Sequence, residues 1–268
     1  CMNRNAPKEL LDDTKKSYYE SEFLIKKWHL KSRLKYAITP RFALTSTSSQ
    51  LEALGDLWKK YPDCLMQTHL SEQLEEIKLI NELFPKSLDY LDVYEKFGLL
   101  QSKSIFGHCI HLKNREYEAL GISKASVAHC PTSNLFIGSG IFNLKRVLKN
   151  NINVGLATDT AGGTSFSMLK TMSAAYNIGQ LSGLAIHPAQ LLWLATVGSS
   201  KSLHLDKKIG NIEAGKYADL AIIDLSSSVL IDTRRKKAEN FWEELFPTLI
   251  MGDDRAIIST WISGKEFK

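Results

Sequence analysis

The chain has 268 residues, of which 44% are hydrophobic and 24% are charged, and its formal net charge is +5. This length can bury a full-sized core in one large domain or two unequal ones. No apolar run reaches the roughly 18 residues of a membrane span, and the N-terminus lacks the hydrophobic region of a signal peptide, so both classes are disfavoured.

The chain has only four cysteines, and its positive charge is spread along the sequence. Cys64, Cys109 and Cys130 lie in apolar runs, where a free thiol behaves as a small hydrophobic group. We therefore expect reduced thiols and a cytoplasmic protein. The one dense basic run, Arg234–Lys237, is typical of a solvated segment, and we expect no nucleic-acid or membrane partner.

The first part of the chain alternates helical and strand-like patterns. The predicted elements are an amphipathic helix over 12–35, a short strand over 35–42, a helix over 48–60, a strand over 64–69 and a helix to about 84. Ser71 is a favoured N-cap residue, which places His69 at the end of a strand and Glu72 in the first turn of the next helix.

The alternation continues to about residue 203. Strands are predicted over 104–110, 126–131 and 153–159, and helices over 114–120, 144–150, from 167 onward and over 188–203. Strands that alternate with helices predict a parallel sheet covered by helices.

The pattern changes near the C-terminus. Residues 209–216 are rich in turn formers, and strands are predicted over 218–224 and within 257–267, with a hairpin at Ser263-Gly264. We expect residues 1–205 to form a barrel of alternating strands and helices. Residues 206–268 would form the remnant of a small β-subdomain with a C-terminal helix and strand.

Polar or ionisable side chains stand at the points where the predicted strands end. Arg41, His69, His108 and Asp159 each end one strand, and His129 with Asn134 follows the remaining one. Such convergence is typical of the mouth of a (β/α)8 TIM-type barrel, whereas an open doubly wound sheet uses a single crevice. Five strands are recognised, with a trace of a sixth at Cys1-Met2, so the predicted barrel is incomplete at its N-terminal strands.

These side chains have the chemistry of metal-assisted hydrolysis. The imidazole of His69 and the carboxylate of Asp159 are suitable zinc ligands, and Glu72 can carry protons. Phe42, which directly follows Arg41, could face a planar substrate. The tryptophans at helical spacing are expected in the core instead; they are Trp28, Trp58, Trp193 and Trp242.

Other sites are disfavoured by the residues themselves. His108 and Cys109 are neighbours on a strand and point to opposite faces, so they do not suit one structural zinc ion. The chain has no C-x-x-C, which excludes the zinc deaminases that require it. It has no G-x-S-x-G either, and the near P-loop at 210–217 precedes a strand where a helix is needed.

Four segments together resemble the amidohydrolase superfamily. They are Gln67–Glu72, Gly107–Cys109, Ala128–Leu135 and Gly155–Gly163, which resemble the fifth to eighth barrel strands of that superfamily. Three further segments resemble the guanine deaminase family within it, and the resemblance covers nearly the whole chain. These are Met2–Pro7, Thr39–Phe42 and Met251–Arg255.

The resemblance implies zinc-dependent hydrolysis of guanine to xanthine and ammonia. It implies that His69 and Asp159 bind zinc, that Glu72 shuttles protons, and that His108 holds the attacking water. Asp159 would also accept a proton, and Arg41 and Phe42 would recognise the purine beside the metal ligands. It further implies a homodimer of the complete enzyme.

The first-strand segment of the family, G-F-x-D-x-H-x-H, has no counterpart here, since no H-x-H occurs in the chain. That segment supplies two more zinc ligands in the family. We therefore expect a C-terminal portion of such an enzyme, with weak zinc binding and little turnover alone. Two alternatives stay open: a deaminase of another heterocycle, such as an S-adenosylhomocysteine-type or triazine substrate, and a non-catalytic amidohydrolase-like binding protein.

Overall fold

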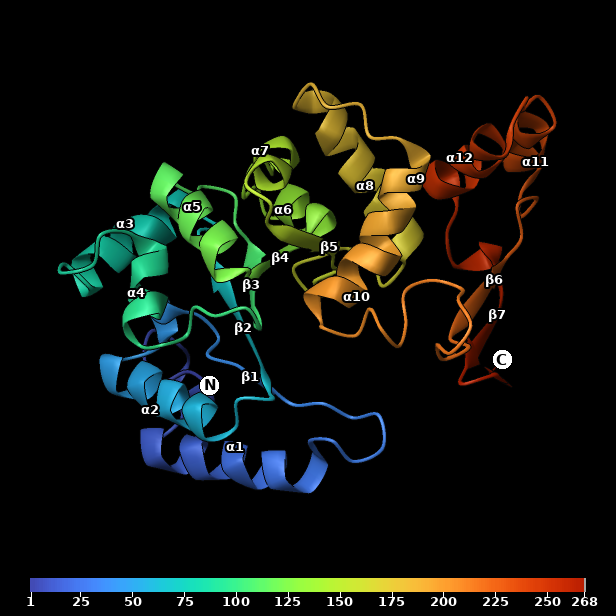
Figure 1. Ribbon diagram of the computed structural model, residues 1–268. Helices are drawn as coiled ribbons and strands as arrows, with labels where there is room; N and C mark the ends of the chain where they lie inside the picture. Colours follow the sequence, from blue (N-terminus) through green and yellow to red (C-terminus); the bar gives the residue numbers. More distant parts are fainter. Residues whose placement is uncertain (268) are drawn as a thin grey trace. The chain divides into compact units, whose positions relative to one another are not determined.

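The computed structural model describes residues 1–267 as two compact units (Figure 1). The first unit comprises Cys1–Ala128 and Arg146–Asn153. The second comprises His129–Lys145 and the residues from Val154 onward. The domain boundary predicted between residues 205 and 206 divides the chain at a different place from these two units, and it stays a prediction.

A five-stranded sheet has the order β1-β2-β3-β4-β5. Its strands are β1 (Ala37–Ile38), β2 (Leu65–Leu70), β3 (Ser104–His108), β4 (Ser126–His129) and β5 (Asn153–Leu156). The pairs from β1 to β4 are parallel, and Met66, Phe106 and Val127 on these strands are fully buried. The predicted α/β fold with a parallel sheet is thus confirmed, while closure of a complete barrel stays a prediction.

Helices connect these strands in the first unit. They are α1 (Thr14–Trp28), α2 (Ser48–Lys60), α3 (Leu74–Leu83), α4 (Tyr90–Lys96) and α5 (Asn114–Ser123), with short 3-10 turns η1 (Lys8–Leu10) and η2 (Ala43–Thr45). Side chains that accept the free backbone N–H groups start three of the helices, at Asp13, Thr47 and Asp89. Figure 1 shows α3, α4 and α5 gathered beside β2 and β3. Helix α7 (Leu144–Lys149) precedes β5.

Among the predicted boundaries that were wrong, two have clear local reasons. The helix expected over 12–35 ends at Trp28, because the chain turns back to the sheet with Leu30 and Ser32 in the left-handed region at φ 59° and 55°. His29 Nδ1 accepts from the backbone N–H of Tyr36 across this turn at 3.1 Å. The strand expected over 126–131 stops at His129, because Pro131 is well suited to begin a helix.

Two of the tryptophans expected in the core are not there. Trp58 is only 2% exposed and its indole N–H donates to the carbonyl of Cys64 at 3.0 Å, whereas Trp28 is 46% exposed and Trp242 is 37% exposed. Trp28 is the last residue of α1, and the Nζ atom of Lys27 lies 5.0 Å from its ring centroid. Helical spacing alone therefore did not identify the covered face.

A charged cluster joins α1 to the end of α2. Glu22 lies 2.6 Å from Lys60 Nζ and 3.2 Å from Lys26 Nζ, and it accepts a hydrogen bond from the Tyr61 hydroxyl at 2.9 Å. The contact with Lys60, followed by that with Tyr61, lowers the pKa of Glu22 to about 2. A carboxyl group with a lowered pKa stabilises the fold above its unfolded pKa of about 4.3, and that contribution disappears as the pH falls toward 2.

We expect Glu22→Gln to be less stable than the unchanged chain at pH 7 and to match it near pH 2. Urea unfolding midpoints across this range measure the difference. Glu20→Gln is the control, since Glu20 is exposed and lies 3.8 Å from Lys16. A Glu22→Gln difference that stays constant with pH would contradict the ion-pair origin.

The second unit is largely helical. Its helices are α6 (Pro131–Phe136), α8 (Met168–Leu181), α9 (Pro188–Trp193), a π-helical turn η3 (Leu194–Gly198), α10 (Ser199–Ser202), α11 (Val229–Arg235) and α12 (Phe241–Met251). Helix α12 packs on α8, α9 and α11. The helix predicted over 188–203 is thus present, with a π-helical turn in its middle. None of the helices in residues 1–267 is long and apolar enough to cross a membrane.

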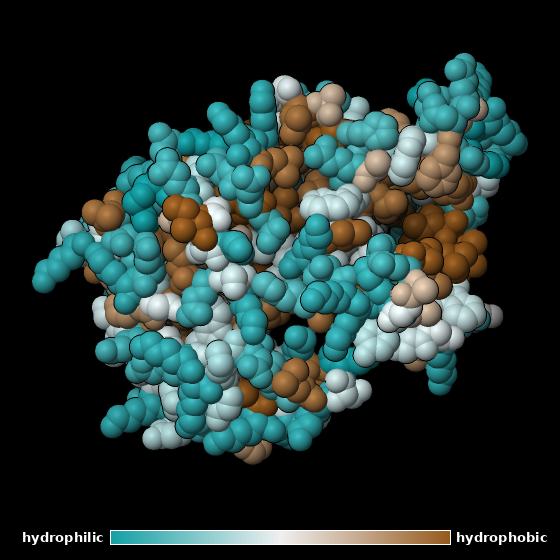
Figure 2. Space-filling view, in the orientation of Figure 1, coloured by the Kyte–Doolittle hydropathy of each residue, from teal (hydrophilic) through white to brown (hydrophobic). Residues whose placement is uncertain are grey.

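The predicted C-terminal strands are present as a separate antiparallel sheet. Strand β7 (Ile257–Ile262) pairs with β6 (Leu220–Ile223) and with β8 (Lys265–Phe267), and the short 3-10 turn η4 (Asp254–Ala256) precedes it. Ile222 and Ile257 on this sheet are 42% and 39% exposed. Figure 2 shows brown, hydrophobic surface in this part of the second unit.

The predictions of buried cysteines and of a solvent-exposed basic run agree with the described residues. Cys64, Cys109 and Cys130 are buried and form no disulfide among the described residues, and burial raises the pKa of Cys64 to about 11. In the basic run, Arg234 and Lys237 are exposed.

Candidate active site

Two histidines predicted as site residues stack at the ends of neighbouring strands in the first unit. Leu70 pairs with His108 in the β2–β3 register, which brings the rings of His69 and His108 to 5.1 Å between centroids at an angle of 23°. The ring of Phe42 lies 5.4 Å from that of His69. Residues from three separate chain segments therefore meet at one edge of the sheet.

Glu72 joins this cluster through His108. One carboxylate oxygen of Glu72 lies 3.2 Å from His108 Nδ1, and the two side chains are 13% and 3% exposed. A carboxylate and an imidazole at this distance, largely screened from solvent, can exchange and hold a proton. We define these three side chains, His69, Glu72 and His108, as the imidazole–carboxylate cluster.

The helix after β2 begins later than predicted. Ser71 is not its N-cap: α3 starts at Leu74 with Gln73 at the cap, so Glu72 precedes the helix. Ser71 is buried with φ 50°, and its carbonyl accepts from the backbone N–H groups of two residues that follow β3, Ile110 and His111. This sharp turn, set by the neighbouring strand, points the chain toward α3 only after Glu72.

Glu76 is a supporting residue that was not predicted. One of its carboxylate oxygens accepts from the backbone N–H groups of Glu72 at 2.9 Å and Gln73 at 3.1 Å, and the other accepts from the Tyr90 hydroxyl at 2.5 Å. The spacing of Gln73 and Glu76 is that of a capping box, which is the sequence signal that could have identified it.

The imidazole of His69 is arranged to present one nitrogen outward. Its Nδ1 lies 2.6 Å from the carbonyl oxygen of Arg41. Because a carbonyl only accepts, Nδ1 carries the hydrogen and Nε2 keeps its lone pair. Burial, then the charge of His108, lowers the pKa of His69 and favours the neutral ring. A neutral histidine whose second nitrogen donates to a backbone carbonyl is the usual form of a metal ligand, so this residue fits the predicted zinc role.

The predicted recognition residues lie beside this cluster. Arg41 is exposed, and its guanidinium carbon lies 6.0 Å from the ring centroid of Phe42. Its backbone N–H donates to the carbonyl of Cys1 at 2.9 Å. A guanidinium next to an aromatic face offers both hydrogen-bond donors and a stacking surface.

Asp159 belongs to the second unit, where it opens a tight turn after β5. The backbone N–H of Gly163 donates to its carbonyl at 2.5 Å, and Thr132 Oγ1 donates to the carbonyl of Thr158 at 3.3 Å. A Cβ atom on Gly163 would lie 1.9 Å from the oxygen of Thr158, so only glycine fits there. Asp159 itself has φ 47°.

His129 and Asn134, which also follow a predicted strand, lie in the second unit as well. His129 ends β4, is 1% exposed, and stacks on Phe142 with ring centroids 4.2 Å apart. Its carbonyl accepts from the backbone N–H of Ala157 at 2.9 Å, which holds the end of β5 beside it. Asn134 is a buried residue of α6.

Left-handed backbone conformations recur at these positions. Ser71, His108, Cys109 and Asp159 have φ values of 50°, 68°, 53° and 47°, although none is glycine. Non-glycine residues adopt this region rarely, and they concentrate at functional sites where the surrounding structure stabilises the strain. No local sequence signal indicated this feature.

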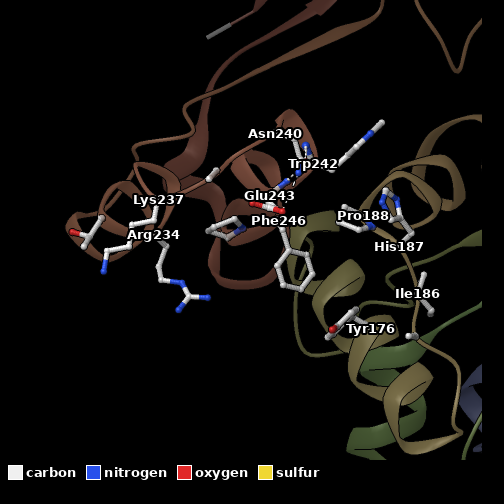
Figure 3. Close-up of a pocket in the computed structure, with 14 residues that line it drawn as sticks. Tyr176, Ile186, His187, Pro188, Arg234, Lys237, Asn240, Trp242, Glu243 and Phe246 are labelled. Carbon is white, nitrogen blue, oxygen red and sulfur yellow. Dashed lines mark hydrogen bonds between the residues drawn. The ribbon is translucent and has the colours of Figure 1, made fainter.

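A separate pocket of about 770 Å³ lies in the second unit (Figure 3). Figure 3 shows Tyr176, Trp242 and Phe246 among its lining residues, together with Arg234 and Lys237. None of the predicted site residues lines it.

Comparison with known proteins gives one consistent result. The amidohydrolase family profile matches residues 6–267. Guanine deaminase of Escherichia coli K12 is 42% identical over 264 residues, which cover 98% of this chain and 60% of that protein. The chain thus spans about 60% of the length of the curated relative that it matches.

Solved structures agree. The structure of E. coli guanine deaminase superposes with a TM-score of 0.98 at 42% identity, covering 100% of this chain and 62% of the other. Guanine deaminase from C. acetobutylicum, solved with guanine in its active site, gives a TM-score of 0.90 at 31% identity, covering 100% of this chain and 64% of the other.

Proposed function

The chain belongs to the amidohydrolase family, and we propose that the polypeptide carrying it hydrolyses guanine to xanthine and ammonia. The observation that supports this most directly is the imidazole–carboxylate cluster, in which Glu72 contacts His108 and the ring of His108 stacks on that of His69. The similarity to guanine deaminases directs the choice of substrate.

We propose zinc as the cofactor, with His69 Nε2 and Asp159 as two of its ligands. When bound, zinc supplies Lewis-acid activation of water. The hydrogen bond from His69 Nδ1 to the carbonyl of Arg41 holds the ring in the tautomer that this role needs. Three expectations stay predictions: that the chain is the C-terminal portion of such an enzyme, that the complete enzyme is a homodimer, and that it is cytoplasmic.

In the proposed reaction, the oxygen of water adds to the ring carbon that carries the exocyclic amine. The bond from this carbon to the exocyclic nitrogen then breaks, and the nitrogen leaves as ammonia. Glu72 receives a proton from the water and delivers it to the ring nitrogen. The proton of the hydroxyl group formed on the carbon then passes to the leaving nitrogen, so that the carbon keeps a carbonyl oxygen. Asp159 assists as a proton acceptor, and His108 holds the water while its contact with Glu72 keeps the carboxylate in place.

Substrate recognition is assigned to Arg41 and Phe42. The guanidinium can donate hydrogen bonds to the oxygen and ring nitrogens of a purine, and Phe42 presents an aromatic face 5.4 Å from the ring of His69. Adenine nucleosides carry a ribose that this recognition does not require, so guanine is the expected substrate.

The test is an assay of ammonia release and xanthine formation. It is performed on this chain and on the whole encoded polypeptide that contains it, each supplied with zinc. Guanine is compared with S-adenosylhomocysteine and a triazine. Xanthine formed from guanine at the highest kcat/KM supports the proposal. Faster turnover of another heterocycle overturns the substrate assignment, and no turnover of any of the three by the whole polypeptide overturns the enzyme assignment in favour of a binding protein.

A further inference from the structure

Tyr94 is the most completely buried polar group beside the imidazole–carboxylate cluster. It lies in α4, is 0% exposed, and packs between Tyr90 and Phe106 with ring centroids 5.7 Å and 5.6 Å away. A hydroxyl group removed from water to this extent destabilises the fold unless it is hydrogen-bonded. Its partners therefore show why this position is a tyrosine.

The Tyr94 hydroxyl connects two chain segments of the proposed site. It accepts from the backbone N–H of Ala43 at 2.9 Å and donates to the carbonyl of His69 at 2.8 Å. Thr68 Oγ1 also lies 3.1 Å from this hydroxyl and 3.2 Å from the carbonyl of Arg41. Through these hydrogen bonds, one oxygen atom links the turn after β1 to the end of β2.

Both segments carry a proposed functional residue. Ala43 directly follows Phe42 in the turn, and the carbonyl that Tyr94 binds belongs to His69 itself. The carbonyl of Arg41 in turn accepts from His69 through the backbone N–H at 3.3 Å and through Nδ1 at 2.6 Å. Hydrogen bonds therefore link the turn that holds Arg41 and Phe42 to both the backbone and the imidazole of His69.

We propose that Tyr94 is a positioning residue that sets the recognition turn Arg41–Phe42 in register with His69. The inference rests on the proposed function for its consequence in catalysis, while the hydrogen-bonded link itself is a property of the first unit. Tyr94 does not touch the reacting atoms. It acts through the backbone of Ala43 and His69.

Tyr94→Phe is the decisive variant, since it keeps the ring and its packing and removes one oxygen. The N–H of Ala43 and the carbonyl of His69 then lose a buried partner. We expect the turn to move and both KM and kcat for guanine to worsen, with kcat/KM falling roughly 10-fold or more. A variant that is only less stable would lose kcat in proportion to its unfolded fraction and keep its KM.

Amide hydrogen exchange supplies a readout that does not depend on activity. The peptide that contains Ala43 should exchange roughly 10-fold faster in Tyr94→Phe, because its N–H has lost its acceptor. Tyr61→Phe is the matched control: it removes a tyrosine hydroxyl of the same unit that donates to Glu22 at 2.9 Å, outside the proposed site. It should leave exchange at Ala43 and KM unchanged.

The outcomes separate the two proposals. Unchanged exchange at Ala43 in Tyr94→Phe, or an equal change in Tyr61→Phe, overturns the positioning role whatever the activity. If Tyr94→Phe is active and shows faster exchange at Ala43 but an unchanged KM, the part of Tyr94 in substrate recognition is overturned. If the unchanged polypeptide does not deaminate guanine, the proposed function fails, and the exchange experiment still decides whether Tyr94 holds the turn.

Discussion

In the proposed deamination of guanine, Glu72→Gln is expected to lower kcat by about 10² to 10⁴-fold, the usual contribution of a positioned general acid–base group. Glutamine has nearly the same shape and can still hydrogen-bond His108, which lies 3.2 Å from Glu72. It cannot take up and release a proton at neutral pH. KM should therefore change little, and steady-state kinetics on guanine measure both constants.

Glu75→Gln is the matched control for this loss. Glu75 lies three residues away in α3 and is exposed, so the substitution removes an equal charge without touching the imidazole–carboxylate cluster. It should retain the kcat of the unchanged polypeptide in the proposed reaction. A Glu72→Gln enzyme that keeps a tenth or more of kcat would show that another group moves the protons.

Gly163→Ala is expected to displace Asp159 and to lower kcat/KM by about 10²-fold, because a shift of about 1 Å in a catalytic group has effects of this size. The added methyl group would lie 1.9 Å from the carbonyl oxygen of Thr158, 2.9 Å from that of Asp159 and 3.0 Å from Thr132 Oγ1. Two of these contacts are with backbone, which cannot rotate away. The free energy of unfolding should also fall by about 1–3 kcal/mol, as for other overpacked sites.

Gly183→Ala separates this effect from general backbone strain. Gly183 lies in the same unit at φ 70°, and nothing lies within 4 Å of where its Cβ would be. Alanine there should cost about 1 kcal/mol of stability from the left-handed conformation and leave kcat/KM unchanged. Chemical denaturation and guanine kinetics on both variants make the comparison. Equal kinetics for Gly163→Ala and the unchanged enzyme would remove Asp159 from the proposed mechanism.

The residues of the candidate site were predictable because they stand at the ends of strands. Apolar runs bounded by turn formers indicated β2 and β3, and His69 and His108 follow from where those runs stop. The supporting residues were not predictable in the same way. Tyr94 lies in α4, a helix of seven residues that is too short for a clear periodic pattern, and its partners are 51 and 25 positions away in the chain.

Two errors in the predictions have physical causes that the local residue pattern did not show. Ser71 is a common N-cap residue, yet the hydrogen bonds that its carbonyl accepts from Ile110 and His111 hold it in a left-handed turn instead. Trp28 has the spacing of a core residue, yet it ends its helix and is 46% exposed. For Ser71 a contact distant in the sequence decided the outcome, whereas for Trp28 the end of the helix at a local turn did.

The amino-acid sequence by itself determined the alternation of the main strands and helices and the types of side chain that stand at the strand ends. Both depend on periodicity and on turn formers, which act over a few residues. Only the tertiary structure decided that the ring of His69 stacks on His108, that Glu72 contacts the latter, and that Tyr94 links the segments holding Phe42 and His69. These contacts depend on strand register and on buried hydrogen bonds between distant segments, which form only when the sheet and its covering helices pack together.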